Sequence, residues 1–161
     1  MKERKAIYAG TFDPLTFGHL DLIERSAEIF DQVILAIAVR SPKQTLFSIE
    51  ERTIFTRDAV KHLKNVEVDT FDGLLVEYAR SRGVSILIRG IRAYSDFESE
   101  FQMALTNRTM APEIETVFVM SGEKHAFYNS TMVKQIISLG GDASAFAPAA
   151  VIKRVKKKLE G

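Results

Sequence analysis

Short apolar segments alternate along this chain with segments of helical periodicity, and this alternation limits the possible folds more than any other feature. The strand-like segments are 5–9, 33–39, 66–71, 85–88 and 115–120. Segment 33–39 is apolar throughout, which is typical of a strand covered on both faces of a parallel sheet. The alternation predicts an α/β fold, a doubly wound, Rossmann-like, five-stranded parallel sheet with helices on both faces.

Capping signals predict where several helices begin. The sequences S-I-E-E at 48–51 and S-D-F-E at 95–98 are capping boxes, in which side chains satisfy backbone N–H groups of the first turn. A helix over 130–139 is expected to take Asn129 as its N-cap, because Asn caps about as well as Ser. Pro148 fits the first position of a last helix, where a missing N–H has no cost.

Length, charge and cysteine content exclude several classes of protein. The chain has 161 residues, of which 46% are apolar, so a single domain over 1–161 with a full hydrophobic core is expected. The net charge of +1 predicts no bulk attraction to nucleic acid or to a membrane surface. No apolar stretch has the length of a membrane span or follows the charged N-terminus as in a signal peptide. The absence of Cys suits a reducing compartment, and a cytoplasmic protein is expected.

The basic run K-R-V-K-K-K at 153–158 has two interpretations. Val151, Ile152, Val155 and Leu159 recur at helical spacing, so the run is interpreted as the solvated side of a packed helix. Binding of RNA through these charges is the less favoured alternative.

The loop G-T-F-D-P-L-T-F-G-H at 10–19 joins the first strand to the first helix. Such a loop forms an anion site, because the first-turn N–H groups are unpaired and lie at the positive end of the helix dipole. Thr16 and His19 stand three residues apart at the helix entry, and Gly18 is expected to leave room there for a ligand. An ordinary turn with a hydrogen-bonded His is the alternative, and the complete string favours the functional interpretation.

Chemically distinctive residues follow the carboxyl end of every predicted strand. In doubly wound sheets, ligands bind at that edge, where the strand order reverses. The residues are Thr11 and His19 after the first strand, Lys43 after the second, 72–75 after the third, Arg89 and Arg92 after the fourth, and 129–131 after the fifth.

This set is cationic and lacks a convincing nucleophile. No Cys is present, and neither Ser130 nor Thr131 has a His base at a recognisable spacing. The three His residues are scattered, which gives no metal cluster, and neither a Walker motif nor G-x-G-x-x-G occurs. Such a site suits transfer at phosphorus by positioning and charge neutralisation, with a nucleophile supplied by the substrate. The cationic candidates are His19, Lys43, Arg89, Arg92 and Lys134.

Structural interpretations of the cations stay open. Arg89 and Arg92 have the alternative of a solvated loop pair that is salt-bridged to Asp96 or Glu98. For Lys43 the alternative is a solvent-facing loop lysine.

The segment 10–19 resembles the T/H-x-G-H motif of the nucleotidyltransferase superfamily. Together with S-P-K-Q-T-L-F-S-I-E-E-R at 41–52, I-R-G-I-R-A-Y-S-D-F-E at 88–98 and Y-N-S-T-M-V-K at 128–134, it is similar to the bacterial phosphopantetheine adenylyltransferases over nearly the whole chain. This resemblance implies transfer of the AMP part of ATP to 4′-phosphopantetheine, with release of pyrophosphate and formation of dephospho-coenzyme A. It also implies Mg²⁺ bound mainly through substrate phosphates, a cytoplasmic homohexamer, and feedback inhibition by coenzyme A.

The resemblance also implies roles by position, with His19 stabilising charge on the α-phosphate during in-line attack and no covalent enzyme intermediate. Catalytic roles fall on His19, Lys43, Arg92 and Thr11. Phosphopantetheine would contact Thr11, Lys43, Leu74, Leu75, Arg89 and Asn107. ATP would contact Thr11, Phe12, His19, Gly90, Ile91, Arg92, Glu100, His125, Ala126, Phe127, Tyr128, Asn129, Ser130 and Thr131.

Two alternatives to this function remain at the level of sequence. One is another small-molecule nucleotidyltransferase of the superfamily, such as a nicotinamide-mononucleotide adenylyltransferase or a cytidylyltransferase. The other is a non-catalytic sensor of nucleotide or coenzyme A. The combination of Thr16, His19, Lys43, Arg89 and Arg92 argues against the sensor, because binding alone does not need all of these side chains.

Overall fold

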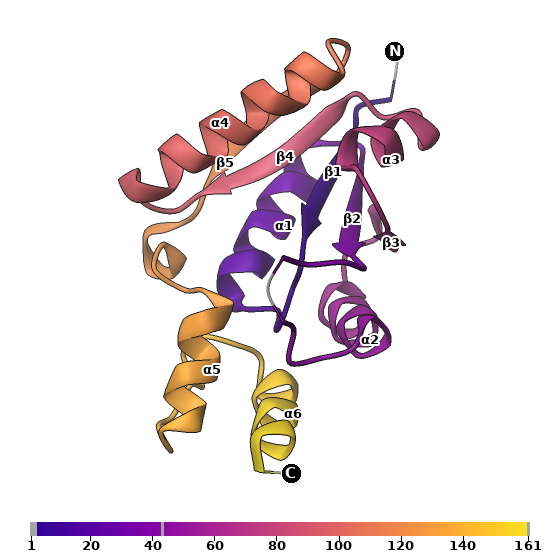
Figure 1. Cartoon of the computed structure of the whole chain (residues 1–161). Helices are drawn as coiled ribbons and strands as arrows, with labels where there is room; N and C mark the ends of the chain where they lie inside the picture. Colours follow the sequence, from indigo (N-terminus) through magenta and orange to yellow (C-terminus); the bar gives the residue numbers. More distant parts are fainter. Residues whose placement is uncertain (1–2, 43, 161) are drawn as a thin grey trace.

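Five parallel strands form one sheet, in the order β3-β2-β1-β4-β5, in a computed structural model that describes residues 3–42 and 44–160 (Figure 1). This architecture confirms the predicted fold class. The strands are β1 (Lys5–Gly10), β2 (Gln32–Ala38), β3 (Val66–Phe71), β4 (Ile86–Ile91) and β5 (Glu115–Met120). The helices are α1 (Phe17–Ile29), α2 (Ile49–Val60), α3 (Leu75–Ser81), α4 (Tyr94–Met110), the short 3₁₀ helix η1 (Glu123–His125), α5 (Ser130–Ser138) and α6 (Ala149–Glu160).

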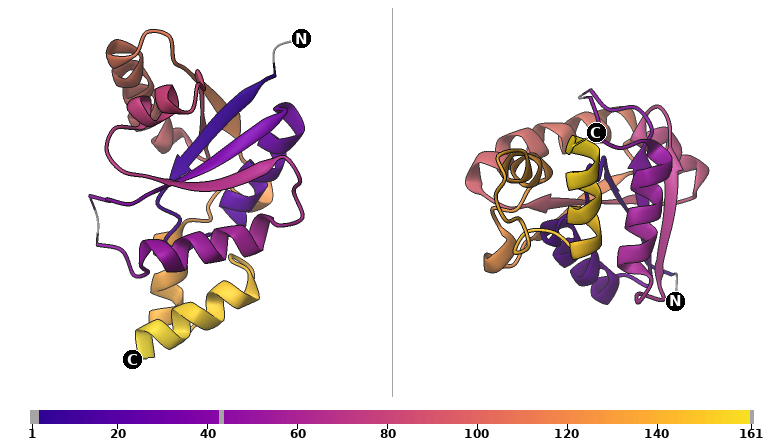
Figure 2. Two further views of the ribbon diagram at one scale, coloured as in Figure 1. Left: turned by 90° about the vertical axis from the view of Figure 1, so that its right-hand side faces the viewer. Right: turned by 90° about the horizontal axis from the view of Figure 1, so that it is seen from below.

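The central strand β1 separates two hydrophobic cores. Successive side chains of a strand point to opposite faces of the sheet. Ala6 and Tyr8 therefore pack in the core under α1 and α2, whereas Ile7 and Ala9 pack in the core under α3 and the end of α4. Helices thus cover both faces of the sheet, as Figure 2 shows from two directions.

A third core holds α5 and α6 beyond the carboxyl ends of the strands (Figure 1). Its buried residues come from α2, α5 and α6 and from the segments that precede α2 and α6, so that α6 packs beside α2. Lys158 contacts Glu51 at 3.1 Å, and the guanidinium of Arg154 lies 4.6 Å from the centre of the Phe55 ring. Two cations of the basic run therefore contact α2, and the predicted packed helix is confirmed, although Leu159 is 42% exposed instead of buried.

The fourth strand is longer than its apolar run. The sequence predicts its end at residue 88, but β4 continues to Ile91 because Arg89 and Gly90 pair with Phe118 and Val119 of β5. Arg89 therefore projects from a strand instead of a loop. Pairing with a neighbouring strand extends β4 past the point where hydrophobicity ends.

The capping predictions have different outcomes. The Ser48–Glu51 box is confirmed by reciprocal hydrogen bonds of 3.2 and 2.9 Å. The box at 95–98 is wrong, because α4 begins at Tyr94 with Ala93 as its N-cap. The chain enters this helix almost directly from β4, which places the first turn before the predicted cap. Pro148 lies just before α6, where its carbonyl accepts from Ile152 N–H at 3.0 Å, so it occupies the N-cap position.

Asn129 is confirmed as the N-cap of α5, since its side-chain oxygen accepts from the backbone N–H of Met132 at 2.8 Å. We expect Asn129→Ala to lower the free energy of unfolding by about 1 kcal/mol, because this N–H loses its partner. Asn129→Ser restores the cap and serves as the control, with stability near that of the wild type. Urea unfolding of the three proteins measures both effects, and equal stabilities for the Ala and Ser variants would contradict the capping role.

Candidate active site

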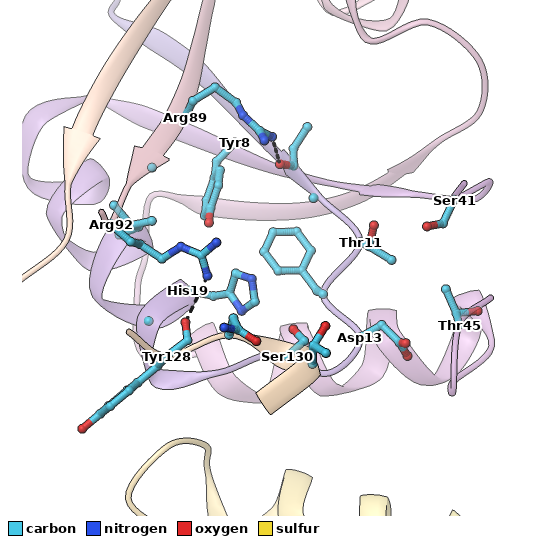
Figure 3. A pocket seen from close by; sticks show the side chains of 18 of the residues that line it. Tyr8, Thr11, Asp13, His19, Ser41, Thr45, Arg89, Arg92, Tyr128 and Ser130 are labelled. Carbon is cyan, nitrogen blue, oxygen red and sulfur yellow. Dashed lines mark hydrogen bonds between the residues drawn. The ribbon is translucent and has the colours of Figure 1, made fainter. Parts of the chain in front are cut away.

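A cavity of about 440 Å³ opens at the carboxyl ends of β1 and β4, where the strand order reverses (Figure 3). This is the position at which doubly wound sheets bind ligands. The loop after β1, the starts of α1 and α5, and the segment after β2 contribute to its wall. The sequence-predicted residues that line it are Thr11, Phe12, His19, Arg89, Gly90, Arg92, Glu100, Tyr128, Asn129, Ser130 and Thr131.

Several predicted residues lie away from this cavity. Leu74 is 56% exposed and Leu75 packs in the core under α3, because β3 ends two strands away from β1. Asn107 stands seven residues after Glu100 on α4, about 10 Å further along the helix axis. Lys43 lies outside the described residues. The remaining predicted residues that do not line the cavity are Ile91, His125, Ala126 and Phe127.

His19 is oriented by a capping box in which an imidazole takes the place of the usual Glu or Gln. Its ring Nδ1 accepts from the backbone N–H of Thr16 at 3.0 Å, and the backbone N–H of His19 donates to Thr16 Oγ1 at 3.3 Å. An Nδ1 that accepts this bond carries no proton, so the proton of the neutral ring is on Nε2. The motif T-x-G-H therefore caps α1 and leaves Nε2–H as the ring's remaining donor for the cavity.

Burial and, to a smaller extent, the nearby charges of Arg92 and Arg89 together lower the pKa of His19 to about 4. The imidazole is consequently neutral at pH 7. A neutral donor suits a site that receives phosphate, because Nε2–H can donate a hydrogen bond while the buried imidazole stays uncharged.

This lowered pKa predicts a pH-dependent stability. The unfolded chain protonates His19 near pH 6.5 and the folded protein only near pH 4, so stability falls as the pH falls through this window. We expect the wild type to lose about 2 kcal/mol relative to His19→Gln between pH 7 and pH 4.5. Urea unfolding at several pH values measures the difference, and parallel curves for the two proteins would contradict the low pKa.

Phe12 packs between two polar rings of the cavity. Its ring lies 5.6 Å from Tyr8 and 5.1 Å from His19, with edge-to-face geometry in both pairs. Its backbone is left-handed, with φ of 50°, which is uncommon for a bulky residue. Strain of this kind persists only where surrounding contacts hold it and is common at functional sites. The side chain of Phe12 is 2% exposed, so it supports the site from within the core.

Arg89 is held by an ion pair that the sequence did not predict. Its Nε and Nη2 donate to the two carboxylate oxygens of Glu100 at 2.6 and 2.7 Å, and its Nη1 donates to the carbonyl of Ala9 at 3.1 Å. Both charged side chains are largely buried. The pair fixes β4 against α4 and balances part of the positive charge beside the cavity.

Two further cations also have acidic partners. Arg92 contacts Asp96 at 3.3 Å and donates to the carbonyl of Tyr128 at 3.2 Å. Lys134 contacts Asp13 at 3.0 Å. The site is therefore less positive than the sequence suggested, and an incoming phosphate would find cations that are already held in place.

The start of α5 lies against the loop that follows β1. The hydroxyl of Ser130 donates to the carbonyl of Pro14 at 2.7 Å, whereas Thr131 is exposed at the cavity wall. The first-turn N–H groups of α5 add the positive end of a helix dipole to the site.

Gly18 has a different role from the predicted one. A Cβ at this position would lie 3.0 Å from the carbonyl oxygen of Tyr128. Its missing side chain therefore admits the backbone of the segment before α5, in addition to any ligand. This close contact joins the starts of α1 and α5 at one edge of the cavity.

Two buried charged residues that sequence reasoning missed organise the surrounding loops. Asp13 accepts from the backbone N–H groups of Leu46 and Phe47 at 2.8 and 2.9 Å, in addition to its contact with Lys134. Arg52 is 2% exposed and donates to three backbone carbonyls, those of Thr11, Ala38 and Phe47. Only their positions in the quoted motifs signalled them, since neither belongs to a periodic pattern.

A helix-entry imidazole and a helix N-terminus meet at the switch point of this doubly wound sheet, and the comparisons with known proteins place the chain among the nucleotidyltransferases. The model of the family described as cytidylyltransferase-like matches residues 7–136. Curated relatives narrow the class: the phosphopantetheine adenylyltransferase of Heliobacterium modesticaldum is 48% identical and covers 95% of this chain and 91% of its own length. The phosphopantetheine adenylyltransferase of Methylococcus capsulatus is 50% identical, and the alignment covers 97% of this chain and 96% of that protein. The chain belongs to the phosphopantetheine adenylyltransferase family.

A solved structure with little sequence similarity shares the fold. The nicotinic acid mononucleotide adenylyltransferase of Plasmodium falciparum, complexed with NaAD, aligns with a TM-score of 0.73 at 11% identity, over 97% of this chain and 96% of that one. No helix within residues 3–42 and 44–160 has the length and hydrophobicity that a membrane span requires.

Proposed function

We propose that this protein transfers the adenylyl group of ATP to 4′-phosphopantetheine, giving dephospho-coenzyme A and pyrophosphate. An oxygen of the pantetheine phosphate attacks the α-phosphorus of ATP in line, and the bond from this phosphorus to the oxygen that bridges to the β-phosphate breaks. The observation that carries the proposal is His19, a neutral imidazole whose Nδ1 is engaged by Thr16 and whose Nε2–H remains for a phosphate in the cavity.

The proposal assigns one group of cations and hydrogen-bond donors to each of the two substrates. Thr11, Lys43 and Arg89 hold the attacking phosphate; three of the N–H groups of Arg89 are engaged within the protein, which leaves two for a ligand. Arg92 and the start of α5 hold the triphosphate, where first-turn N–H groups and Thr131 face the cavity.

The surroundings of Ser130 support direct transfer without a covalent enzyme intermediate. The hydroxyl of Ser130 donates to the carbonyl of Pro14 instead of to a base, and the only imidazole among the described residues that line the cavity, that of His19, uses Nδ1 for its cap. An activated nucleophile needs a base within hydrogen-bonding distance. The substrate phosphate is already anionic and needs no such activation.

Mg²⁺ enters this proposal with ATP. Asp13 accepts bonds from Leu46, Phe47 and Lys134, and Glu100 is paired with Arg89, so both carboxylates that line the described cavity have protein partners. Phosphate oxygens are preferred ligands of Mg²⁺ in nucleotide sites. The ion would therefore be held mainly by the triphosphate and would neutralise its charge during transfer.

An assay of substrate choice tests the function. The purified protein with ATP and Mg²⁺ should release pyrophosphate when 4′-phosphopantetheine is added, and much less with nicotinamide mononucleotide or when CTP replaces ATP. Preference for either alternative substrate would assign the protein to another nucleotidyltransferase activity. Binding of ATP without any pyrophosphate release would instead support the sensor.

The assembly, location and regulation belong to the same proposal: a cytoplasmic homohexamer that coenzyme A inhibits. In support of self-association, α4 carries an exposed apolar stripe of Phe97, Phe101 and Leu105, each about half exposed, beside the edge strand β5. The rings of Phe97 and Phe101 are stacked 5.6 Å apart. Phe101→Glu should reduce the mass measured by light scattering if copies of this chain cover the stripe, and an unchanged mass would exclude it from the interface.

A further inference from the structure

Tyr8 is a buried polar side chain of the cavity to which the proposed transfer assigns no role. It lies near the end of β1, its side chain is 6% exposed, and its ring packs edge-to-face against Phe12. No residue in the described part of the chain hydrogen-bonds to its hydroxyl, although the residue lines the cavity. A tyrosine hydroxyl that is this deeply buried normally has a partner.

The hydroxyl is open to the cavity instead of being sealed in the core. Within residues 3–42 and 44–160, the one fully buried side-chain oxygen or nitrogen without a partner is Ser121 Oγ, so the Tyr8 oxygen keeps access to solvent. Figure 3 shows the ring of Tyr8 between Arg89 and Arg92, with its hydroxyl directed toward Arg92 and His19. An open hydroxyl at this place is available to a ligand.

The surroundings of Tyr8 indicate an anionic ligand. The charges of Arg89 and Arg92 act on its hydroxyl, and Phe12 packs against both Tyr8 and His19. Burial nevertheless raises the pKa of Tyr8 to about 12, so the phenol is protonated at neutral pH and serves as a hydrogen-bond donor. A donor flanked by two guanidinium groups matches the oxygens of a phosphate.

We propose that the hydroxyl of Tyr8 donates a hydrogen bond to an oxygen of a reacting phosphate and is a catalytic residue beside His19. This inference rests on the proposed adenylyl transfer. The phosphate is either the α-phosphate of ATP or the phosphate of 4′-phosphopantetheine, which share the chemistry that the site recognises. No proton is transferred, since the hydroxyl acts only as a donor to charge.

Tyr8→Phe removes the hydroxyl and preserves the ring that packs on Phe12. We expect kcat/KM to fall by about 10- to 100-fold, because hydrogen bonds to charged groups are among the stronger ones. The melting temperature should stay the same or rise, since the hydroxyl has no partner among the described residues.

Tyr78→Phe is the matched control, because the Tyr78 hydroxyl donates to Asp69 at 2.7 Å and the residue does not line the cavity. It should lower the melting temperature and leave kcat/KM within about twofold of the wild type. Tyr8→Phe should show the opposite pattern, a lower kcat/KM with an unchanged or higher melting temperature, which distinguishes a role toward substrate from a structural role.

Calorimetric titrations of Tyr8→Phe with ATP and Mg²⁺, and separately with 4′-phosphopantetheine, identify the phosphate. Weaker binding of one substrate assigns the hydrogen bond to that substrate, and a loss confined to kcat places it in the transition state. Kinetic constants for both substrates within twofold of the wild type would overturn the proposal. An inactive wild type would instead refute the proposed function.

A measurement on the wild type covers the case in which Tyr8→Phe does not fold. Labelling tyrosine at Cζ with ¹³C gives four signals, which Phe substitutions at the other three tyrosines assign by elimination. The Tyr8 signal should shift when one of the two substrates binds. A signal unmoved by both would overturn the proposal.

Discussion

His19→Ala is expected to lower kcat by a hundredfold or more, with a much smaller change in KM. In the proposed reaction the imidazole donates Nε2–H to the reacting phosphates, and its pKa of about 4 keeps it neutral, so this interaction would strengthen as negative charge develops during transfer. Losing one preorganised donor to such charge costs about 3 kcal/mol or more in the transition state. Steady-state kinetics with both substrates varied measures the effect.

The capping role of His19 requires a control, because His19→Ala also removes the acceptor of the Thr16 N–H bond. This loss should lower the free energy of unfolding by about 1 kcal/mol. His19→Gln places a regular capping-box residue at the position, and we expect it to recover stability while activity stays low. Near-normal kcat in the folded Ala variant would make the residue structural.

Arg52→Leu should have the largest effect on stability, about 3 kcal/mol or more. The guanidinium of Arg52 is the donor to the carbonyls of Thr11, Ala38 and Phe47, and a leucine would leave all three without this partner. Each buried carbonyl that loses a partner costs about 1–3 kcal/mol. For a chain of this size the melting temperature should fall by roughly 6–12 °C.

Arg57→Leu is the matched control, since Arg57 lies on the same helix and its side chain makes an exposed bond of 3.4 Å to Val68. It should change stability by less than about 0.5 kcal/mol. The KM values of Arg52→Leu should also rise, because Arg52 holds the backbone of Thr11 at the wall of the cavity. Melting temperatures that are equal in the two variants would show that the carbonyls find other partners.

Interactions between neighbours in the sequence were predictable because they need no knowledge of the fold. Thr16 and His19 stand three residues apart, and a helix entry necessarily brings them together. Asn129 caps α5 for the same reason. The alternation of apolar and amphipathic segments predicted the sheet, since each parallel strand needs a crossover helix. The sequence placed the candidate site at the carboxyl ends of the strands, and the structure has a cavity at that edge, beside β1 and β4.

Partners that lie far apart in the sequence were decided by the tertiary structure. Lys134 meets Asp13 across 121 positions, and Arg52 reaches Thr11 across 41. A charged residue in a sequence shows neither its partner nor its burial, because both depend on which elements the strand order brings together. The same reason explains why Leu74 and Leu75 do not line the cavity. They follow β3, and the strand order places β3 at the edge of the sheet, two strands away from β1.

The residue types alone determined that this chain builds an α/β sheet and presents an imidazole and a helix N-terminus at one edge, because periodicity and capping act within a few residues. Which hydroxyl stays free for a ligand was decided by packing. Ser130 donates to Pro14, whereas Tyr8, which reads as an ordinary strand residue, keeps an open hydroxyl between two arginines. A hydrogen bond is available to substrate only where the fold has not already used it, and that follows from three-dimensional neighbours alone.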